Sequence, residues 1–366
     1  MESLTRRSEL VERSLNLSFL SPAFLGGADQ KGQYRTPPFK ALLREWWRVA
    51  VAPENDYDWK KILEKERPLF GSVSGGARQS QVRLRLKDWD PGEMNDLDKI
   101  QERIHRSPSP PLNPGLYLGY GPISNDNGKL AMKSTPAIFA KKNTLEIYYP
   151  KSCQEEMERT LLLIQAFGTL GGRSHNGWGS VDLFSEDPAP FVWGETFPND
   201  LTFATRSLED CLRQDWPTAI GCDERGPLVW RVKENSLPQQ KEAQQKEVLK
   251  RLALLREGVN QKGKIVGDVG GVIGRELLSY PIVYRDNRQG SFGREFRLPS
   301  PLRFKVVKGA NGTGGTKSFG AIVYHMPFSI EKINRENQRK FWAMVHRDVL
   351  DNHESFTRIG RGGSIG

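Results

Sequence analysis

The chain reads AFGTLGGRSHNGWGSV from Ala166 to Val181, where a helical pattern gives way to a strand pattern. Five glycines lie within twelve residues of this stretch. Glycine lets main-chain N–H groups approach a ligand closely and adopt positive φ, and successive N–H groups beside a guanidinium bind anions. The stretch therefore suits a phosphate backbone. Its candidate contacts are Gly171, Gly172, Arg173, Ser174, His175 and Asn176.

A tight helix-to-strand turn around a core tryptophan explains the same composition. Trp178 is the residue on which the two interpretations differ, because it is either a stacking face for a base or part of the core. We expect Trp178 in the core.

The elements predicted at the start of the chain lead to a helix with two distinct faces. Residues 14–20 alternate polar and apolar as a half-buried strand does, and a loop with Gly26 and Gly27 follows. A helix then begins at Pro38, since proline is favoured in a first turn. Its apolar face is formed by Phe39, Leu42, Leu43 and Trp46.

The other face of this helix carries Lys40, Arg44 and Arg48, spaced four residues apart. Like charges at this spacing cost a few tenths of a kcal/mol per pair, and a bound anion would remove that cost. The alternative is a solvated face on which Glu45 and other acids offset the charge.

The rest of the first half completes a recognisable order of elements. A glycine-rich loop over 70–78 contains Arg78, and 82–87 reads as a strand with one apolar and one basic face. Further patterns predict a strand over 144–149, a helix over 154–167 and a strand over 180–184. Strand, helix, strand, strand, helix, strand is the order of the split βαβ, or ferredoxin-like, unit.

The second half repeats this architecture less clearly, after a boundary marked by Pro188 and Pro190. Its predicted elements are a strand over 228–232, a helix over 238–257 ending near Gly258, strands over 302–308 and 319–324, and a helix over 330–351. The 302–308 strand is expected to have a basic face. We therefore predict an α+β protein of two tandem ferredoxin-like (RRM-like, split βαβ) domains, residues 1–187 and 188–366.

Composition points to an acidic partner and a cytoplasmic protein. The chain has 366 residues, with 54 Lys and Arg against 44 Asp and Glu, a formal net charge of +10. Such an excess favours nucleic acid or an anionic surface. Three widely spaced cysteines without a C-x-x-C pair fit a reducing compartment. No apolar run approaches the roughly 20 residues of a membrane span.

Several catalytic classes find no motif in this sequence. The five histidines are scattered without a metal-ligand spacing, and neither a nucleophile elbow nor a phosphate-binding loop of NTPases is present. Residues 317–324 fit the RNP1 pattern of RRM domains only in part, and a plain core strand is the favoured interpretation. We expect no cofactor and no metal.

Four segments together resemble a known family. They are SPAFLGG at 21–27, YRTPPFKALLREWWR at 34–48, the glycine-rich stretch from Gly168 to Ser180, and RLPSPL at 297–302. The chain resembles the RAMP superfamily of CRISPR effector proteins and, within it, the first subunit of the Cmr-type (type III-B) complex. Pro38 and Ala41 stand where this helix usually has serine and glycine, and His175-Asn176 replaces a more basic pair.

The resemblance implies a non-catalytic RNA-binding subunit that contacts the crRNA 3′ region and the target RNA duplex. Its implied partners are crRNA, target RNA and the other Cmr-type effector subunits, especially the backbone subunit. Backbone subunits of such complexes cut target RNA with a loop aspartate, so Asp29 is considered as a catalytic acid. The rival hypothesis is a RAMP endoribonuclease that uses Asp29 or His175, and a third is a purely architectural subunit.

The predicted RNA contacts converge on a basic cleft shared by the two domains. They are the glycine-rich stretch above together with Gly26, Gly27, Lys40, Arg44, Arg48 and Arg78. Phosphate contacts of this kind carry little sequence information. Replacing Lys40, Arg44 and Arg173 together with alanine is expected to weaken RNA binding and leave the thermal midpoint nearly unchanged.

Overall fold

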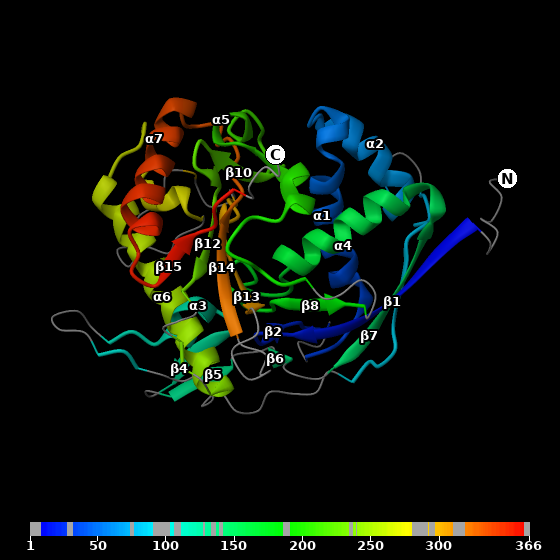
Figure 1. Ribbon diagram of the computed structural model, residues 1–366, viewed down its shortest axis with the longest axis horizontal. Coiled ribbons are helices and arrows are strands. Elements are labelled where there is room, and N and C mark those ends of the chain that lie inside the picture. Colours follow the sequence, from blue (N-terminus) through cyan, green and yellow to red (C-terminus); the bar gives the residue numbers. More distant parts are fainter. Residues whose placement is uncertain are drawn as a thin grey trace. The chain divides into compact units, whose positions relative to one another are not determined.

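The protein folds into two compact units in this computed structural model (Figure 1). The first contains Met1–Leu97 and Gly119–Trp193, and the second contains Asp98–Leu118 and Gly194–Gly366. The second unit thus includes a short segment from the first half of the chain, Asp98–Leu118. The structure describes residues 9–27, 32–73, 77–90, 103–105, 111–126, 129–132, 137–138, 142–185, 191–233, 237–238, 240–279, 292, 297–309 and 319–361.

A four-stranded antiparallel sheet forms the base of the first unit. Its strand order is β3-β7-β1-β8, from β3 (Arg83–Leu86), β7 (Asn143–Pro150), β1 (Leu10–Phe19) and β8 (Val181–Phe184). The predicted alternation in β1 is confirmed, because Leu15, Leu17 and Phe19 are buried. In β3, Arg83 and Arg85 are exposed and Leu86 is buried, as the pattern indicated.

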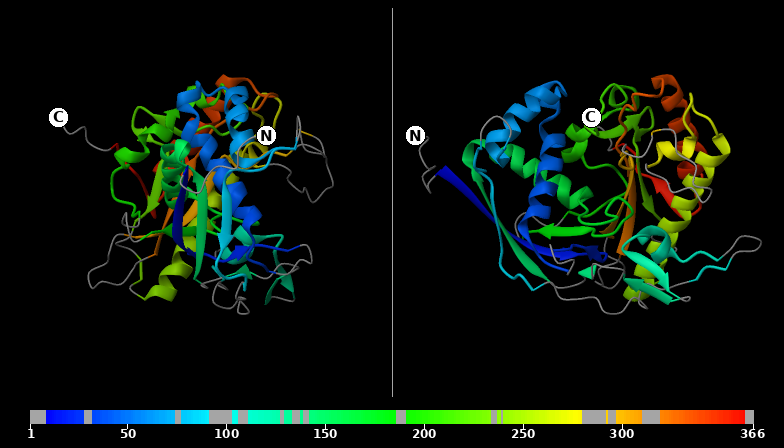
Figure 2. Two further views of the ribbon diagram at one scale, coloured as in Figure 1. Left: turned by 90° about the vertical axis from the view of Figure 1, so that its right-hand side faces the viewer. Right: turned by 180° about the vertical axis from the view of Figure 1, so that it is seen from behind.

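Two helices pack side by side on this sheet, α1 (Thr36–Val51) and α4 (Gln154–Phe167) (Figures 1 and 2). The apolar face predicted for α1 is buried throughout. The paired tryptophans hold the two helices together, since Trp46 stacks on Phe167 at 5.6 Å between ring centroids. Trp47 donates its indole N–H to Glu156 over 3.0 Å.

The remaining elements of the first unit are short, apart from one helix. That helix is α2 (Trp59–Phe70), which Asp58 caps by accepting the N–H of Lys60 over 2.8 Å. The strands β2 (Ala23–Phe24) and β6 (Ala137–Ile138) pair with each other, as do β4 (Ile123–Asp126) and β5 (Lys129–Met132). Two 3₁₀ turns, Pro53–Asn55 and Lys151–Cys153, precede α2 and α4.

The second unit is built on another four-stranded antiparallel sheet, of order β13-β14-β12-β15. Its strands are β13 (Leu302–Lys308), β14 (Phe319–His325), β12 (Val229–Val232) and β15 (Phe356–Arg358). A smaller sheet contains β9 (Thr205–Ser207), β10 (Ile220–Asp223) and β11 (Gly226–Pro227). Arg303 and Lys305, the residues of the basic face predicted for β13, do not face solvent, because they are only 4% and 1% exposed. Alternation fixes the direction of a side chain but not what covers it.

Two long helices of the second unit differ from their predicted bounds. Helix α6 (Lys241–Val266) passes through Gly258 rather than ending there. A glycine in a helix costs about 1 kcal/mol relative to alanine, but a methyl group on Gly263 would lie only 3.0 Å from Cα of Arg275. The glycines therefore admit close neighbours. Helix α7 (Arg335–Val345) starts five residues later than predicted and continues as a π-helix, His346–Asp351.

The other helical segments of the second unit are short. They are α3 (Pro114–Gly119), α5 (Leu208–Cys211) and the 3₁₀ turns Asn199–Ala204 and Gly274–Leu277. At the end of α3 the chain continues into the first unit.

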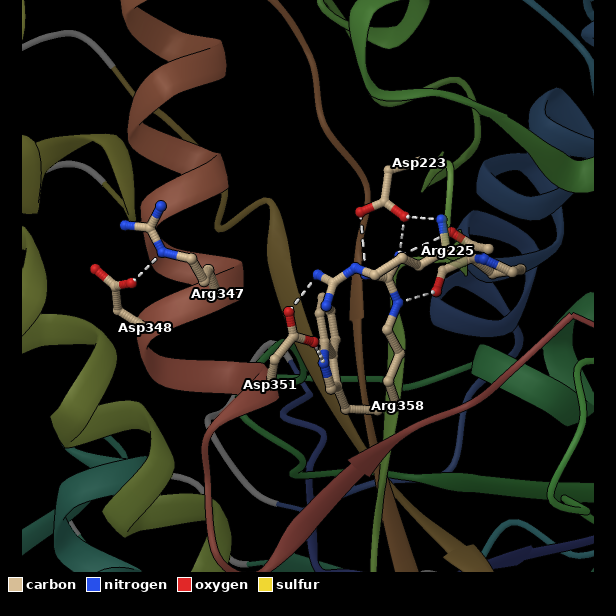
Figure 3. Close-up of polar contacts among 9 residues, drawn as sticks. Asp223, Arg225, Arg347, Asp348, Asp351 and Arg358 are labelled. Carbon is tan, nitrogen blue, oxygen red and sulfur yellow. Dashed lines mark hydrogen bonds and ion pairs between the residues drawn. The ribbon is translucent and has the colours of Figure 1, made fainter.

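A polar cluster fastens the π-helix to the sheets of the second unit (Figure 3). Asp351 accepts hydrogen bonds from the indole of Trp230 over 2.8 Å and from the guanidinium of Arg225. Asp223 accepts two hydrogen bonds from Arg358, over 2.6 and 3.0 Å. Burial would raise the pKa of Asp223, but the hydrogen bonds and charge of Arg358 lower it on balance.

The α+β class predicted from the sequence is confirmed by this architecture. The predicted domain ranges 1–187 and 188–366 stay a prediction. No helix in the described ranges is long and apolar enough to cross a membrane.

Candidate nucleic-acid interface

The glycine-rich stretch is fastened to the segment that follows β1. Ser21, which is fully buried, donates its hydroxyl proton to the carbonyl oxygen of Gly177 over 2.6 Å and accepts the N–H of Ser180 over 3.0 Å. Two of the sequence segments that carried the family resemblance, 21–27 and 168–180, therefore meet in space although about 150 residues of chain separate them.

Main-chain hydrogen bonds extend this contact between the two segments along β2. The N–H of Gly172 donates to the carbonyl of Phe24 over 3.0 Å, and the N–H of Gly179 donates to the carbonyl of Pro22 over 2.8 Å. The amide of Gly172 is thus engaged inside the unit, whereas we expected a free donor for phosphate. Gly171 adopts φ +94°, and a methyl group there would lie 2.7 Å from the Phe24 carbonyl oxygen.

Trp178 belongs to the core, as expected. Its side chain is 0% exposed, and its ring lies 5.1 Å from that of Phe24. Its indole N–H has no hydrogen-bond partner within the described residues. A base therefore has no access to this ring.

Arg173 lies at the outer turn of the stretch. It is exposed and has φ +56°, a conformation that non-glycine residues adopt infrequently. The carbonyl of Arg173 accepts the N–H of Asn176 over 2.9 Å, which closes the turn. A methyl group on Gly121 would lie 3.2 Å from Nη2 of Arg173, so the guanidinium passes directly over this glycine. Within the described residues no ion pair joins Arg173 to a carboxylate.

The neighbours of Arg173 are more covered than it is. Ser174, His175 and Asn176 are half-buried, while Gly172 is exposed. The N–H of Gly177 donates to the carbonyl of Ser174 over 3.1 Å. The accessible part of the predicted contact set is therefore centred on Arg173.

Arg44 and Arg48 have an internal partner that the sequence did not reveal. Both arginines bind Glu66 of α2, whose side chain is 0% exposed. Nε of Arg44 donates to Oε1 of Glu66 over 2.9 Å, and Nη2 of Arg48 donates to the same oxygen over 2.8 Å. Burial would raise the pKa of Glu66, but the hydrogen bonds from the two arginines lower it on balance. Glu66 therefore offsets part of the charge of this stripe, and anion contact by Arg44 and Arg48 stays a prediction.

Lys40 is the remaining cation of that stripe. Partial burial lowers its pKa, and the charge of Arg44 lowers it further. The charge of a bound anion would act in the opposite direction and raise the pKa of Lys40, so Lys40 stays a candidate contact.

The four other residues named from the sequence are Arg78, Gly26, Gly27 and Asp29. Arg78 is exposed, and its backbone pairs with Ser72 ahead of β3, at the sheet edge opposite β8. Gly26 forms a bridge with Gly32, and Gly27 is buried. Asp29 lies outside the described residues. The predicted contacts thus occupy separate parts of the first unit, and one group of them surrounds Arg173.

Glu66 and Gly121 are the site residues that sequence analysis missed. Glu66 stands 18 and 22 positions from its two arginines on another helix, so no periodicity links them. No motif in the sequence singles out Gly121. Among the described residues, no group of three or more His, Cys, Asp and Glu side chains could hold a metal ion.

Comparisons with known proteins bear on this unit. The family model of the RAMP superfamily matches residues 16–182. The comparison with curated proteins gives no match. The residues that match the RAMP superfamily model include β3, β7, α1 and α4 in full, parts of β1 and β8, and the two segments joined by Ser21.

Two solved structures are similar to nearly the whole chain. One is the apo crystal structure of Cmr1 from Pyrococcus furiosus, with 16% identity, a TM-score of 0.45, and coverage of 97% of this chain and 99% of that chain. The other is a cryo-EM structure of the type III-B Cmr-beta complex bound to cognate target RNA, with 15% identity, a TM-score of 0.47, and coverage of 93% and 100%. Residues 16–182 of this chain thus match the family model of the RAMP superfamily.

Proposed function

We propose that this protein is a non-catalytic RNA-binding subunit of a type III CRISPR effector complex. It contacts the crRNA 3′ region and the target RNA duplex through the surface around Arg173. Its partners are crRNA, target RNA and the other Cmr-type subunits, especially the backbone subunit. The RAMP match over residues 16–182 is the observation that carries this proposal.

The geometry of the glycine-rich stretch supports an RNA contact at this surface. Hydrogen bonds from Ser21, Gly172 and Gly179 fix the stretch on the unit. The exposed guanidinium of Arg173 is therefore presented from a fixed backbone, which reduces the conformational entropy lost on binding. Arginine recognises phosphate oxygens through paired N–H donors. Phosphate contacts position a strand without reading its sequence, which suits a protein whose guide RNA reads the target.

The proposed architecture is two tandem ferredoxin-like units. The sheet orders β3-β7-β1-β8 and β13-β14-β12-β15 support it, since each arises from a strand, helix, strand, strand, helix, strand succession. The first unit uses α1 and α4 as its helices, and the second uses α6 and α7.

The experiment that tests this function measures RNA affinity over a salt series. The probe is a fluorescently labelled crRNA, alone and paired with complementary target. The wild-type protein should bind, and its log K should fall linearly with log salt. Arg173→Ala should weaken binding and reduce that slope by roughly 0.7 to 0.9. Failure of the wild-type protein to bind either RNA would favour the architectural alternative and reject the proposal.

A matched control removes the same charge elsewhere. Arg213→Ala in the second unit deletes an arginine whose side chain is 54% exposed and pairs with Glu209 and Asp210. It should leave the salt slope unchanged.

Incubation with paired target RNA distinguishes the rival ribonuclease hypothesis from the proposed subunit. Cleavage that disappears in Asp29→Asn would establish a ribonuclease.

A further inference from the structure

The segment Gly119–Pro122 lies directly against the glycine-rich stretch. A methyl group on Gly119 would lie 3.2 Å from Cε2 of Trp178, and one on Gly121 would lie 3.2 Å from Nη2 of Arg173. A methyl group on Gly172 would lie 3.6 Å from Cγ of Pro122. Contacts on both sides of Tyr120 therefore hold this short segment beside Arg173.

Tyr120 itself is open to solvent within this packed segment. Its side chain is 64% exposed, whereas Trp178 beneath the same segment is 0% exposed. Moving a large aromatic side chain out of water lowers the free energy. An exposed ring on a fixed backbone, beside a guanidinium that pairs with no carboxylate among the described residues, is therefore a candidate binding surface. Tyr120 thus has the accessible aromatic face that the buried ring of Trp178 lacks.

We propose that Tyr120 stacks on a nucleobase of the RNA strand whose phosphate Arg173 binds, an inference that rests on the proposed function. An aromatic ring beside a cation matches the chemistry of one nucleotide, which presents a flat base and an anionic phosphate. Stacking is tolerant of sequence because every base has a π-face. The occupant is an unpaired nucleotide, since a base inside a duplex is already stacked on its neighbours.

The test compares Tyr120 variants in the same RNA-binding measurement. Tyr120→Ala should weaken binding roughly five- to 150-fold, the range measured for loss of one stacked base, with the salt slope unchanged because no charge is lost. Tyr120→Phe keeps the ring and should bind as the wild type does. The matched control is Trp89→Ala, which removes a ring that is 56% exposed and follows β3 at the sheet edge opposite β8.

A fluorescent base reports the stacking directly. 2-Aminopurine placed at successive positions of single-stranded RNA should be quenched at one position by the wild type and by Tyr120→Phe, and not by Tyr120→Ala. Unchanged affinity and quenching in Tyr120→Ala, with a reduced salt slope in Arg173→Ala, would overturn the stacking inference and leave the proposed function intact. Absence of RNA binding in the wild type would overturn both.

Discussion

The hydroxyl of Ser21 donates to the carbonyl of Gly177 over 2.6 Å, deep inside the first unit. The hydroxyl oxygen of Ser21 also accepts a hydrogen bond from the N–H of Ser180 over 3.0 Å. One buried side chain thereby fixes both the turn that presents Arg173 and the start of β8.

We expect Ser21→Ala to destabilise the first unit by about 1–3 kcal/mol, because a buried hydrogen-bonding group loses its partner. RNA affinity should fall as well, since the turn bearing Arg173 loses its anchor. Urea denaturation and the binding assay measure the two effects. Ser18→Ala is the control: Ser18 bonds Asp182 over 3.1 Å at a half-buried position of β1, and its loss should be milder and leave RNA binding unchanged.

Gly179→Ala should be among the most destabilising substitutions in the chain. Gly179 has φ +60°, and a methyl group there would lie 1.8 Å from the carbonyl oxygen of Leu170. The left-handed conformation alone costs roughly 1–2 kcal/mol for an L-residue, and the overlap requires the backbone to move. Loss of soluble protein or a large fall in thermal midpoint is the expected result.

Gly172→Ala serves as its counterpart. A methyl group on Gly172 would meet Cβ of Phe24 at 3.4 Å, an ordinary contact, so folding should be retained. Equal damage from the two substitutions would contradict the geometry of the glycine-rich stretch.

Arg44→Ala and Lys40→Ala should differ in stability although the two residues lie on the same helix. Arg44 binds the buried carboxylate of Glu66, and its removal should cost about 1.5 kcal/mol, near the lower end for a hydrogen bond to a charged group, because the side chain is 37% exposed. Lys40→Ala should stay within roughly 0.5 kcal/mol. Thermal denaturation of both variants is the measurement. A triple variant that includes Arg44→Ala should therefore show a lower thermal midpoint, in contrast to the nearly unchanged midpoint expected from the sequence.

The stability of the second unit should fall below about pH 6.5 because of two buried histidines. Nε2 of His346 lies 3.0 Å from Nδ1 of His325. Burial lowers the pKa of His346 to about 3, with a further contribution from the charge of Arg358, and burial lowers that of His325 well below its usual value, with a smaller effect of His346.

The direction follows from proton linkage. The unfolded state binds protons near pH 6.5 while the folded state does not, so stability is complete above that pH and is lost below it, by about 1.4 kcal/mol per pH unit for each histidine. The charges of Asp223 and Asp351 raise the pKa of His346 and that of Arg225 lowers it, but burial has the larger effect. Denaturant titrations at several pH values measure the slope, which His325→Asn with His346→Asn should flatten. The exposed control His105→Asn should leave it unchanged.

Local sequence patterns determined the elements of the first unit closely. Alternation in β1 and the apolar face of α1 depend only on which residues can face a core, and both are confirmed. The same patterns were less reliable for α6, because glycine weakens a helix intrinsically. Only the fold shows the close neighbour at Gly258, where a methyl group would lie 3.3 Å from Cγ1 of Val349.

The sequence by itself determined the α+β class, the positions of most strands and helices, and the resemblance to the RAMP superfamily, because each of these follows from local periodicity or from contiguous motifs. Only the tertiary structure decided which charged groups are neutralised within the fold and which remain open. Glu66 reaches Arg44 and Arg48 from another helix, and Gly121 lies under Arg173 from a segment about 50 residues earlier in the chain. Such pairings depend on long-range packing, in which residues distant along the chain become neighbours and no local pattern records the approach.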